Sequence, residues 1–331
     1  MLKFLGDILE QLDLADEHLG LSDPNNARFA LMLTDNAVEL TFHKIATDTQ
    51  LELQHLAYKR EQFRHHAALG RAISKHFEPK VKLVELLGII PPEVAHSIVV
   101  LHRRRNEVYH LGVQHQAILL ILARYYFHLA CAFLAIWRPA HFYWSSNQVL
   151  PERAKKYFSG PSSFPGKLDH FHLACRDFAA AHESVRLMLP EALSDHMLEI
   201  VEMTDTDLDI VSNDAPQKST RDDAIVSCQA WAVAFSEKGR EIATERGAGE
   251  LSVWKYVDWF KSNYEFAFRS DPIPGWRKRA EDLRHADSPH KALKVYFDFL
   301  EQTEEVRQAL RENAMAVERH IDDQIERMRG N

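Results

Sequence analysis

Glycine and proline are scarce in this chain of 331 residues, with 12 and 13 copies. An all-β fold rich in turns needs more of both residues, so the composition favours helices. The sequence contains neither a glycine-rich phosphate-binding loop nor a dinucleotide-binding glycine signature. It also lacks a convincing alternation of apolar and polar residues and any repeat of fixed period. Together these absences predict an all-α protein.

Cysteine is rare as well, and its three copies, Cys131, Cys175 and Cys228, lie far apart in apolar helical contexts. This pattern predicts three buried thiols in a reducing compartment. Asp7 comes too early in the chain for the apolar stretch of a signal peptide. We therefore expect a cytoplasmic protein.

An excess of positive charge is also missing, because the formal net charge is −8. This charge argues against nonspecific coating of nucleic acid, so a nucleic-acid site has to be a local basic pocket. The spacing of Asp205, Asp207 and Asp209 resembles the start of a calcium-binding loop. However, Ile210 and Pro216 occupy the positions where such a loop needs a glycine and a glutamate. We expect a solvated acidic loop over residues 204–220, and neither a metal nor a cofactor.

One apolar run, residues 117–137, has the length of a transmembrane helix. However, Arg124 and His128 lie near its middle, and a central arginine costs about 2.5–3.5 kcal/mol on insertion scales. The run therefore predicts a buried central helix and no membrane span.

The length favours two domains. Four substantial helices with short turns predict an antiparallel bundle over residues 1–138. Prolines and glycines mark residues 139–166 as a linker, and residues 167–331 are expected to form a helical C-terminal domain for recognition or regulation. Within the bundle, Asp48 and Thr49 are expected to cap a second long helix that runs through Phe77.

Residues 24–45 predict a helix with one stripe of mostly apolar residues: Phe29, Met32, Leu33, Asn36, Leu40 and His43. Glu39 lies beside Asn36 and His43. These polar residues are either satisfied groups in a core or the lining of a polar cleft.

Arg105 is the sharpest anomaly, because it occupies a core position in the stripe Val94, Ile98, Leu101 and Val108. A fully buried, unpaired arginine is too costly to keep. The stripe must therefore open there onto a cleft, an acidic partner or a second subunit.

Arg105, Asn106 and His110 are the candidate catalytic residues. A histidine can move protons near neutral pH, and an arginine presents a charged fork to phosphate oxygens. The pair suits attack by a ribose 2′-hydroxyl on the adjacent phosphate, without a metal. On a straight helix, residues five apart differ by about 140°. Either the helix loosens, or a two-fold dimer brings both residues into one site.

Aromatic residues between Trp254 and Phe268 precede the basic stretch 277–279. They either stack bases beside a basic strip or form a helix core followed by a solvated turn.

The motif Arg105-Asn106-Glu107-Val108-Tyr109-His110 resembles that of the HEPN (higher eukaryotes and prokaryotes nucleotide-binding) domain, and Asn36 to Leu40 looks like part of the first long helix of this family. The resemblance covers roughly residues 24–138. It implies a metal-independent endoribonuclease that leaves a 2′,3′-cyclic phosphate and works as a homodimer with a composite active site.

By this resemblance, Arg105 and His110 are catalytic and Asn106 supports them. Glu39, Asn36 and His43 are further supporting candidates. The candidate RNA-binding residues flank the motif: Arg103, Arg104 and Tyr109. The implied partners are RNA, with tRNA as one candidate, and an antitoxin or defence-system protein, because such proteins serve as toxins or anti-phage effectors. The alternative is a non-catalytic HEPN module that binds nucleotides or a protein.

Overall fold

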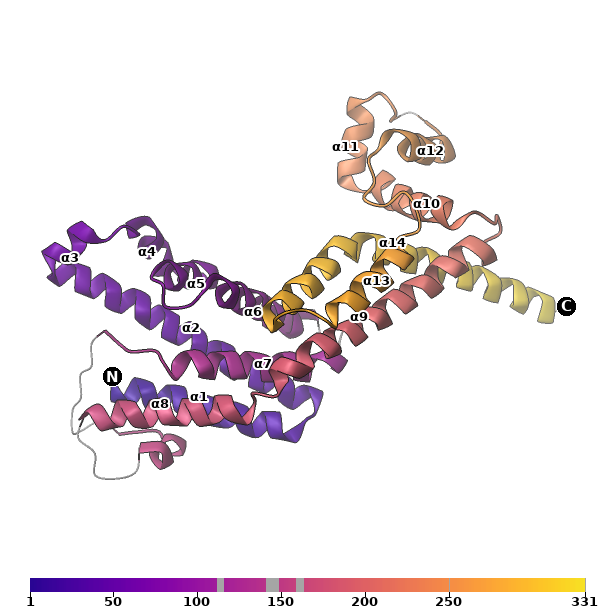
Figure 1. The fold of residues 1–331 in the computed structure, drawn as a ribbon. Coiled ribbons are helices and arrows are strands. Elements are labelled where there is room, and N and C mark those ends of the chain that lie inside the picture. Colours follow the sequence, from indigo (N-terminus) through magenta and orange to yellow (C-terminus); the bar gives the residue numbers. More distant parts are fainter. Residues whose placement is uncertain (112–115, 141–148, 159–163, 250, 331) are drawn as a thin grey trace. The chain divides into compact units, whose positions relative to one another are not determined.

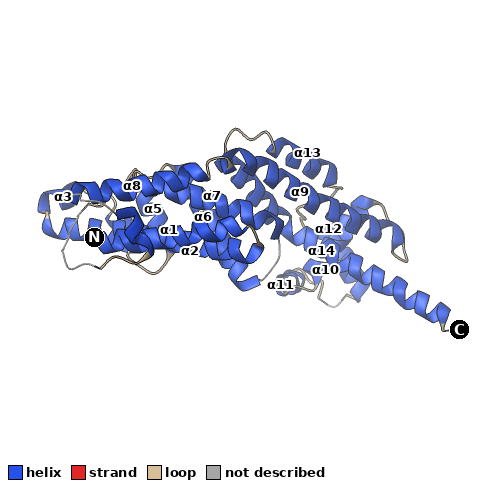
Figure 2. Ribbon diagram, turned by 90° about the horizontal axis from the view of Figure 1, so that it is seen from below, coloured by secondary structure: helices blue, strands red, loops and turns tan. Residues whose placement is uncertain are grey.

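In a computed structural model of the protein, every regular element among the described residues is helical (Figure 2). The structure describes residues 1–111, 116–140, 149–158, 164–249 and 251–330, without the side chains of 106–111, 116, 117 and 164–166. The predicted all-α fold is confirmed.

The chain divides into two compact units, Met1–Leu193 with Ala286–Lys294, and Ser194–His285 with Val295–Asn331 (Figure 1). Unit 1 contains these elements: α1 Leu2–Leu21, α2 Pro24–His55, α3 Ala57–Gln62, α4 His66–Ala72, α5 Phe77–Leu86, α6 Pro92–Leu111, α7 Gln116–Leu134, the 3-10 helix η1 Arg153–Phe158 and α8 Phe164–Ala181. Unit 2 contains the π-helix η2 Ile210–Asp214, α10 Arg221–Ala234, α11 Glu237–Glu245, α12 Val253–Asn263 and α13 Ile273–Leu283. Two helices begin in unit 1 and continue in unit 2: α9 Val185–Asp209 and α14 Pro289–Arg329.

The expected functional boundaries at residues 138 and 167 stay predictions. By packing, α8 belongs to unit 1, where it contacts α7, α1 and η1.

Helix α2 begins at a well-formed cap. Asp23 accepts hydrogen bonds from the backbone N–H groups of Asn25 and Asn26, and Pro24 takes the first helical position. The expected break at Asp48 is absent, because α2 continues to His55. Asp48 forms an ion pair with Lys44, one turn earlier on α2, at 2.5 Å instead of capping a new helix.

Helix α2 packs against α1, α3, α4, α5, α6 and α7 of unit 1. It runs antiparallel to α1, since Asn36 bonds Gln11 and Asn26 bonds His18. It runs parallel to α7, because Asp35 contacts Tyr126 and, seven residues later on both helices, Phe42 contacts Phe133. The finer expectation of an antiparallel HEPN-like bundle stays a prediction.

The polar residues within the apolar run of α7 have partners. Arg124 donates from Nη2 to the carbonyl of Leu19 at 3.3 Å and to Ser22 Oγ at 3.0 Å, at the end of α1. His128 Nδ1 lies 2.9 Å from the carbonyl oxygen of Ala179 in α8. No helix in the described part of the chain has the length and apolar character needed to cross a bilayer.

All three cysteines are buried free thiols, as the sequence predicts. Burial raises the pKa of the Cys228 thiol to about 12, and it also raises the pKa of Cys131 and Cys175. Buried thiols with raised pKa values are poor nucleophiles. They are parts of the core.

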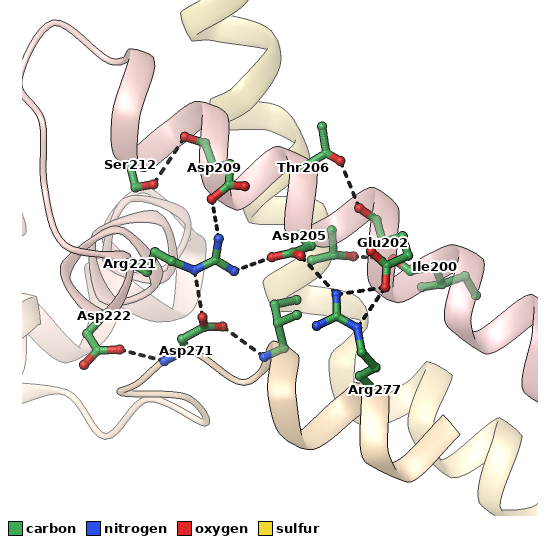
Figure 3. Close-up of polar contacts among 12 residues, drawn as sticks. Ile200, Glu202, Asp205, Thr206, Asp209, Ser212, Arg221, Asp222, Asp271 and Arg277 are labelled. Carbon is green, nitrogen blue, oxygen red and sulfur yellow. Dashed lines mark hydrogen bonds and ion pairs between the residues drawn. The ribbon is translucent and has the colours of Figure 1, made fainter. Parts of the chain in front are cut away.

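The loop expected over residues 204–220 is wrong up to residue 214, because α9 is helical to Asp209 and η2 continues to Asp214. Figure 3 shows the ion pairs that stabilise the negatively charged aspartates near the end of α9. Arg221 pairs with Asp205, Asp209 and Asp271, and Arg277 of α13 pairs with Asp205 at 3.1 Å. Opposing arginines therefore balance the aspartates of α9.

Helices α10, α11 and α12 share a small core within unit 2: Ala230, Ala234, Ala243, Ala248, Val257, Phe260 and Phe266. We call these three helices the aromatic lobe, because partly buried tryptophans and tyrosines pack against this core. Gln229 of α10 donates to the carbonyl of Phe268 at 2.7 Å and so fixes the segment that leaves α12. The lobe is a bundle with its own apolar centre.

Candidate functional site

Arg105 of α6 forms an ion pair with Asp35 of α2. Its Nη2 atom lies 2.6 Å from Asp35 Oδ2, and its Nε atom donates to the same oxygen at 2.8 Å. The Asp35 side chain is fully buried, whereas 27% of the Arg105 side chain remains exposed. Asp35 is thus the acidic partner that an arginine within an apolar stripe requires.

His102 and Tyr126 bind the same carboxylate. His102 Nδ1 lies 2.9 Å from Asp35 Oδ1, and its ring stacks on Phe77 with 3.8 Å between ring centroids. The Tyr126 hydroxyl donates to Oδ1 at 2.9 Å. Burial, and then the Asp35 charge, raise the pKa of Tyr126, so it remains a neutral donor. We call these four residues, Asp35, His102, Arg105 and Tyr126, the Asp35 cluster.

A second ion pair on α2 joins Glu39 to Lys80 of α5, with 3.2 Å between Lys80 Nζ and Glu39 Oε1. The Lys80 side chain is only 3% exposed, and its Nζ also donates to the carbonyl of His76 at 3.0 Å. Glu39, expected as a supporting residue, therefore neutralises a buried lysine. It lies one helical turn after Asp35, so both acids face α5 and α6.

The predicted RNA-binding arginines differ in environment. Arg103 is exposed and pairs with Glu78 at 2.8 Å, whereas Arg104 is buried. The side chains of Asn106, Tyr109 and His110 lie outside the described residues. The backbone of α6 is helical through Leu111.

The stripe expected as core or as the lining of a polar cleft lies on the exposed side of α2. Phe29, Met32 and Leu40 are 52%, 38% and 39% exposed. Asn36 and His43 are exposed too, and the Asn36 amide donates to Gln11 Oε1 at 2.5 Å. The face that α2 buries is instead the one that carries Leu31, Asp35, Val38 and Phe42.

Chemically, the Asp35 cluster holds a guanidinium in one orientation at the edge of a buried polar centre. A carboxylate that accepts three donors is well satisfied, and it limits the rotamers that Arg105 can adopt. Because part of Arg105 reaches the surface, its positive charge can interact with an anionic ligand such as a phosphate. The arrangement offers a positioned cation for anion binding.

Asp35, His102 and Tyr126 were not among the site residues predicted from the sequence. A signal for Asp35 existed, because it takes an apolar position in the series Leu31, Val38 and Phe42. His102 precedes Arg105 by three residues, which places both side chains on one face of α6. Tyr126 gave no signal, because a tyrosine is common in an apolar helix.

The basic stretch 277–279 is largely engaged within unit 2. Arg277 pairs with Glu202 at 2.8 Å, and Arg279 donates to Gln302 Oε1 at 2.8 Å. Trp276 is buried, whereas Trp254 is 72% exposed. The buried Trp276 follows the expectation of a helix core and the exposed Trp254 does not. The expected solvated turn is wrong, because residues 277–279 lie within α13.

Across the described residues, no group of three or more His, Cys, Asp or Glu side chains is placed to hold a metal ion. In comparisons with known proteins, no family model, no curated protein and no solved structure matches this chain.

Proposed function

We propose that the protein is a metal-independent endoribonuclease of the HEPN type. The observation that carries this proposal is the Arg105 guanidinium, fixed by a fully buried carboxylate and yet partly exposed on α6. A cation oriented in this way can stabilise the negative charge that builds up on a phosphate during transfer. The motif around Arg105 supplies the histidine that the reaction also needs.

In the proposed reaction, the ribose 2′-oxygen attacks the adjacent phosphorus atom and gives its proton to a base. The bond from phosphorus to the 5′-oxygen breaks, the 5′-oxygen takes up a proton, and a 2′,3′-cyclic phosphate remains. His110 transfers a proton, Arg105 stabilises the phosphorane-like transition state, and Asn106 supports them. Arg103 and Tyr109 are the proposed RNA contacts, whereas Arg104, the third candidate, is buried.

The proposed active form is a homodimer. Because the backbone of α6 is helical from Arg105 to Leu111, residues 105 and 110 point about 140° apart within one copy. Two copies can bring the arginine of one and the histidine of the other to the same phosphate. The exposed apolar residues Phe29, Met32 and Leu40 on α2 offer a surface for this pairing.

We infer a role as a toxin or anti-phage effector that acts on cellular RNA, with tRNA as one candidate substrate. An antitoxin or another defence-system protein is the corresponding partner. These inferences rest on the motif alone.

The test is cleavage of total RNA by the purified protein in EDTA, with analysis of the fragment ends. We expect discrete fragments with 2′,3′-cyclic phosphate ends from the natural protein and none from His110→Ala. His320→Ala, which removes an exposed histidine of α14, is the matched control and should cleave normally. Unchanged cleavage by His110→Ala, or cleavage that EDTA abolishes, contradicts the proposal.

The Asp35 cluster also favours a second candidate, a non-catalytic HEPN module that binds nucleotides or a protein. An arginine that compensates a buried carboxylate has a structural role whether or not it acts on RNA. For nucleotide binding, this candidate predicts that unlabelled nucleotide or RNA displaces a labelled RNA from the protein. The RNA should remain uncut, and binding should depend on Arg105.

A further inference from the structure

Residues 57–76, which follow α2 in unit 1, form a strongly basic segment. They include five lysine or arginine residues and a single acid, Glu61, although the whole chain carries a formal net charge of −8. The segment consists of α3, α4 and the turns after them, and Figure 1 shows both helices beside the end of α2. We call residues 57–76 the basic tip. It is a local concentration of positive charge, which a nucleic-acid site in an acidic protein requires.

Most of the positive charge of the basic tip is not neutralised by the fold. Lys59 pairs with Glu52 of α2. The other four cations are exposed and form no ion pair with another described residue: Arg60, Arg64, Arg71 and Lys75. By contrast, Arg103 and Arg153 of the same unit also reach the surface, but both pair with acids. An anion from outside the chain can therefore bind the four cations without first breaking an ion pair.

Packing holds the basic tip in place. Three residues of α4 are buried in a core that α4 shares with α2 and α5: Ala68, Leu69 and Ala72. The turn between α3 and α4 is closed by His66, whose Nε2 atom lies 3.1 Å from the carbonyl oxygen of Arg60. The backbone that carries the cations is thus ordered before a ligand binds, which reduces the entropy lost on binding.

Aromatic rings lie among these cations. The Tyr58 side chain is 58% exposed and directly precedes Lys59. The Phe63 ring contacts the rings of His65 and His66, with centroids 5.9 Å and 5.1 Å away. Exposed rings beside cations suit unpaired nucleic acid, because the rings can stack on bases while the cations hold the backbone. A membrane-surface site needs an apolar face, and Tyr58 is the only large hydrophobic side chain exposed within the basic tip.

The basic tip ends beside the Asp35 cluster. His76 is followed directly by Phe77, whose ring stacks on His102 with 3.8 Å between the ring centroids. His102 shares the carboxylate of Asp35 with Arg105. An RNA strand bound to the tip can therefore continue to the Arg105 guanidinium.

We propose that the basic tip binds the backbone of an unpaired RNA segment next to the phosphate at Arg105. Tyr58 stacks on a base, and four side chains contact phosphates: Arg60, Arg64, Arg71 and Lys75. The choice of RNA as the ligand rests on the proposed ribonuclease function, but binding at the tip needs no cleavage. The two proposals can therefore fail separately.

The first test measures binding of a labelled oligouridylate to the full-length protein, by fluorescence anisotropy at several salt concentrations. Fluorine replaces the 2′-hydroxyls of this probe, so the proposed cleavage cannot occur. A variant without the four cations should show a slope of log K against log salt that is flatter by about 2.8, at about 0.7 for each lost contact with a single strand. This variant combines four substitutions: Arg60→Gln, Arg64→Gln, Arg71→Gln and Lys75→Gln.

The matched control removes the same amount of charge from unit 2. It replaces with glutamine four exposed cations that likewise form no ion pair with a described residue: Lys238, Arg240, Lys255 and Lys278. Its slope should equal that of the natural protein, and circular dichroism checks that both variants remain helical. Equal flattening in the two variants would show a general effect of net charge and would overturn the proposal.

The second test removes the exposed ring. Tyr58→Ala should weaken binding of the probe about fivefold or more, because a base loses its stacking partner. Tyr58→Phe keeps the ring and should bind as tightly as the natural protein. Equal binding by Tyr58→Ala and the natural protein would overturn the assignment of an unpaired RNA to the tip.

The remaining outcomes separate the two proposals. Failure of the natural protein to bind the probe, or an unchanged slope in the variant without the four cations, overturns the tip proposal even when the natural protein cleaves RNA. Binding that depends on the tip, together with no cleavage of ordinary RNA, supports the tip proposal and contradicts the ribonuclease. Binding of phosphatidylserine vesicles through the tip, without binding of the probe, would show a membrane site and overturn the proposal.

Discussion

The Asp35 cluster of unit 1 and the Arg221 network of unit 2 solve opposite electrostatic problems. In the first, one fully buried carboxylate accepts from an arginine, a histidine and a tyrosine. In the second, one arginine with 29% of its side chain exposed pairs with three carboxylates. Asp35 and Arg221 each have three partners, but the Asp35 side chain is shielded from water and the Arg221 side chain is not.

Burial, and not the number of ion pairs, therefore decides how much each network contributes to the stability of the fold. A buried charge that loses its partner keeps its full desolvation cost, whereas an exposed charge is solvated again. The Asp35 cluster should therefore be sensitive to the loss of one donor. The Arg221 network should be tolerant and dependent on salt.

The largest effect is expected from Arg105→Ala. The substitution leaves the Asp35 carboxylate buried without its cation, and we expect a loss of about 3 kcal/mol in the free energy of unfolding, measured with urea. RNA cleavage should be lost as well. Adding Asp35→Asn to Arg105→Ala should recover part of the stability, because no charge is then left buried. A double variant less stable than Arg105→Ala would contradict this explanation.

A smaller effect is expected from Arg221→Ala. Its three ion pairs are partly exposed, so we expect a loss of about 1 kcal/mol at low salt. The difference from the natural protein should shrink at high salt, since ions screen exposed charges. Urea unfolding at two salt concentrations measures both values. A loss as large as that of Arg105→Ala, and independent of salt, would break the comparison.

The smallest effect is a difference in pH dependence between the units. Burial lowers the pKa of His128 and His290 in unit 1 below the usual 6.5. Their neutral forms are favoured in the folded state, so this stability is present above pH 6.5 and is lost as the pH falls below it. Burial opposes ionisation of Asp205, but hydrogen bonds from Arg221 and Arg277 outweigh it and lower its pKa from 3.8. That contribution is present above pH 3.8 and is lost as the pH falls further.

Hydrogen exchange resolved by helix can test this difference between pH 7 and pH 5. Protection, corrected for the intrinsic exchange rate, should fall in α7 and α8 and remain in α9 and α10. His290→Asn should weaken the change in unit 1, because it removes a half-buried ring that gains a proton as the pH falls. The nitrogen of this ring lies 2.8 Å from Ser97 Oγ. Equal losses of protection in both units would contradict the assignment.

The helical class could be predicted from the sequence because composition and periodicity both favour helices. Two local expectations failed for the same physical reason. An aspartate can cap a helix or lie in a loop, but it can also form an ion pair within a helix. Asp48 pairs along its own helix with Lys44 instead of capping a new one. Asp205 and Asp209 remain helical because Arg221, twelve or more residues away, neutralises them.

The candidate site could be predicted in part. Arg105 predicted a cleft, an acidic partner or a second subunit at its position, because an unpaired arginine cannot stay within an apolar stripe. The structure shows the acidic partner, Asp35. The identity of the acidic partner could not be predicted, since α2 is apolar on several faces and packs against six helices. Periodicity alone therefore did not separate the exposed stripe with Asn36 from the buried face with Asp35.

The parallel course of α2 and α7 has a consequence for folding kinetics. The hydrogen bond from Tyr126 to Asp35 joins residues 91 positions apart, with α3 to α6 in between. Closing so long a loop costs more entropy than forming the α1–α2 hairpin, and contacts distant in sequence tend to form late. We expect the Asp35 cluster to assemble among the last parts of unit 1, so that any activity at Arg105 during refolding should lag behind the gain of helical signal.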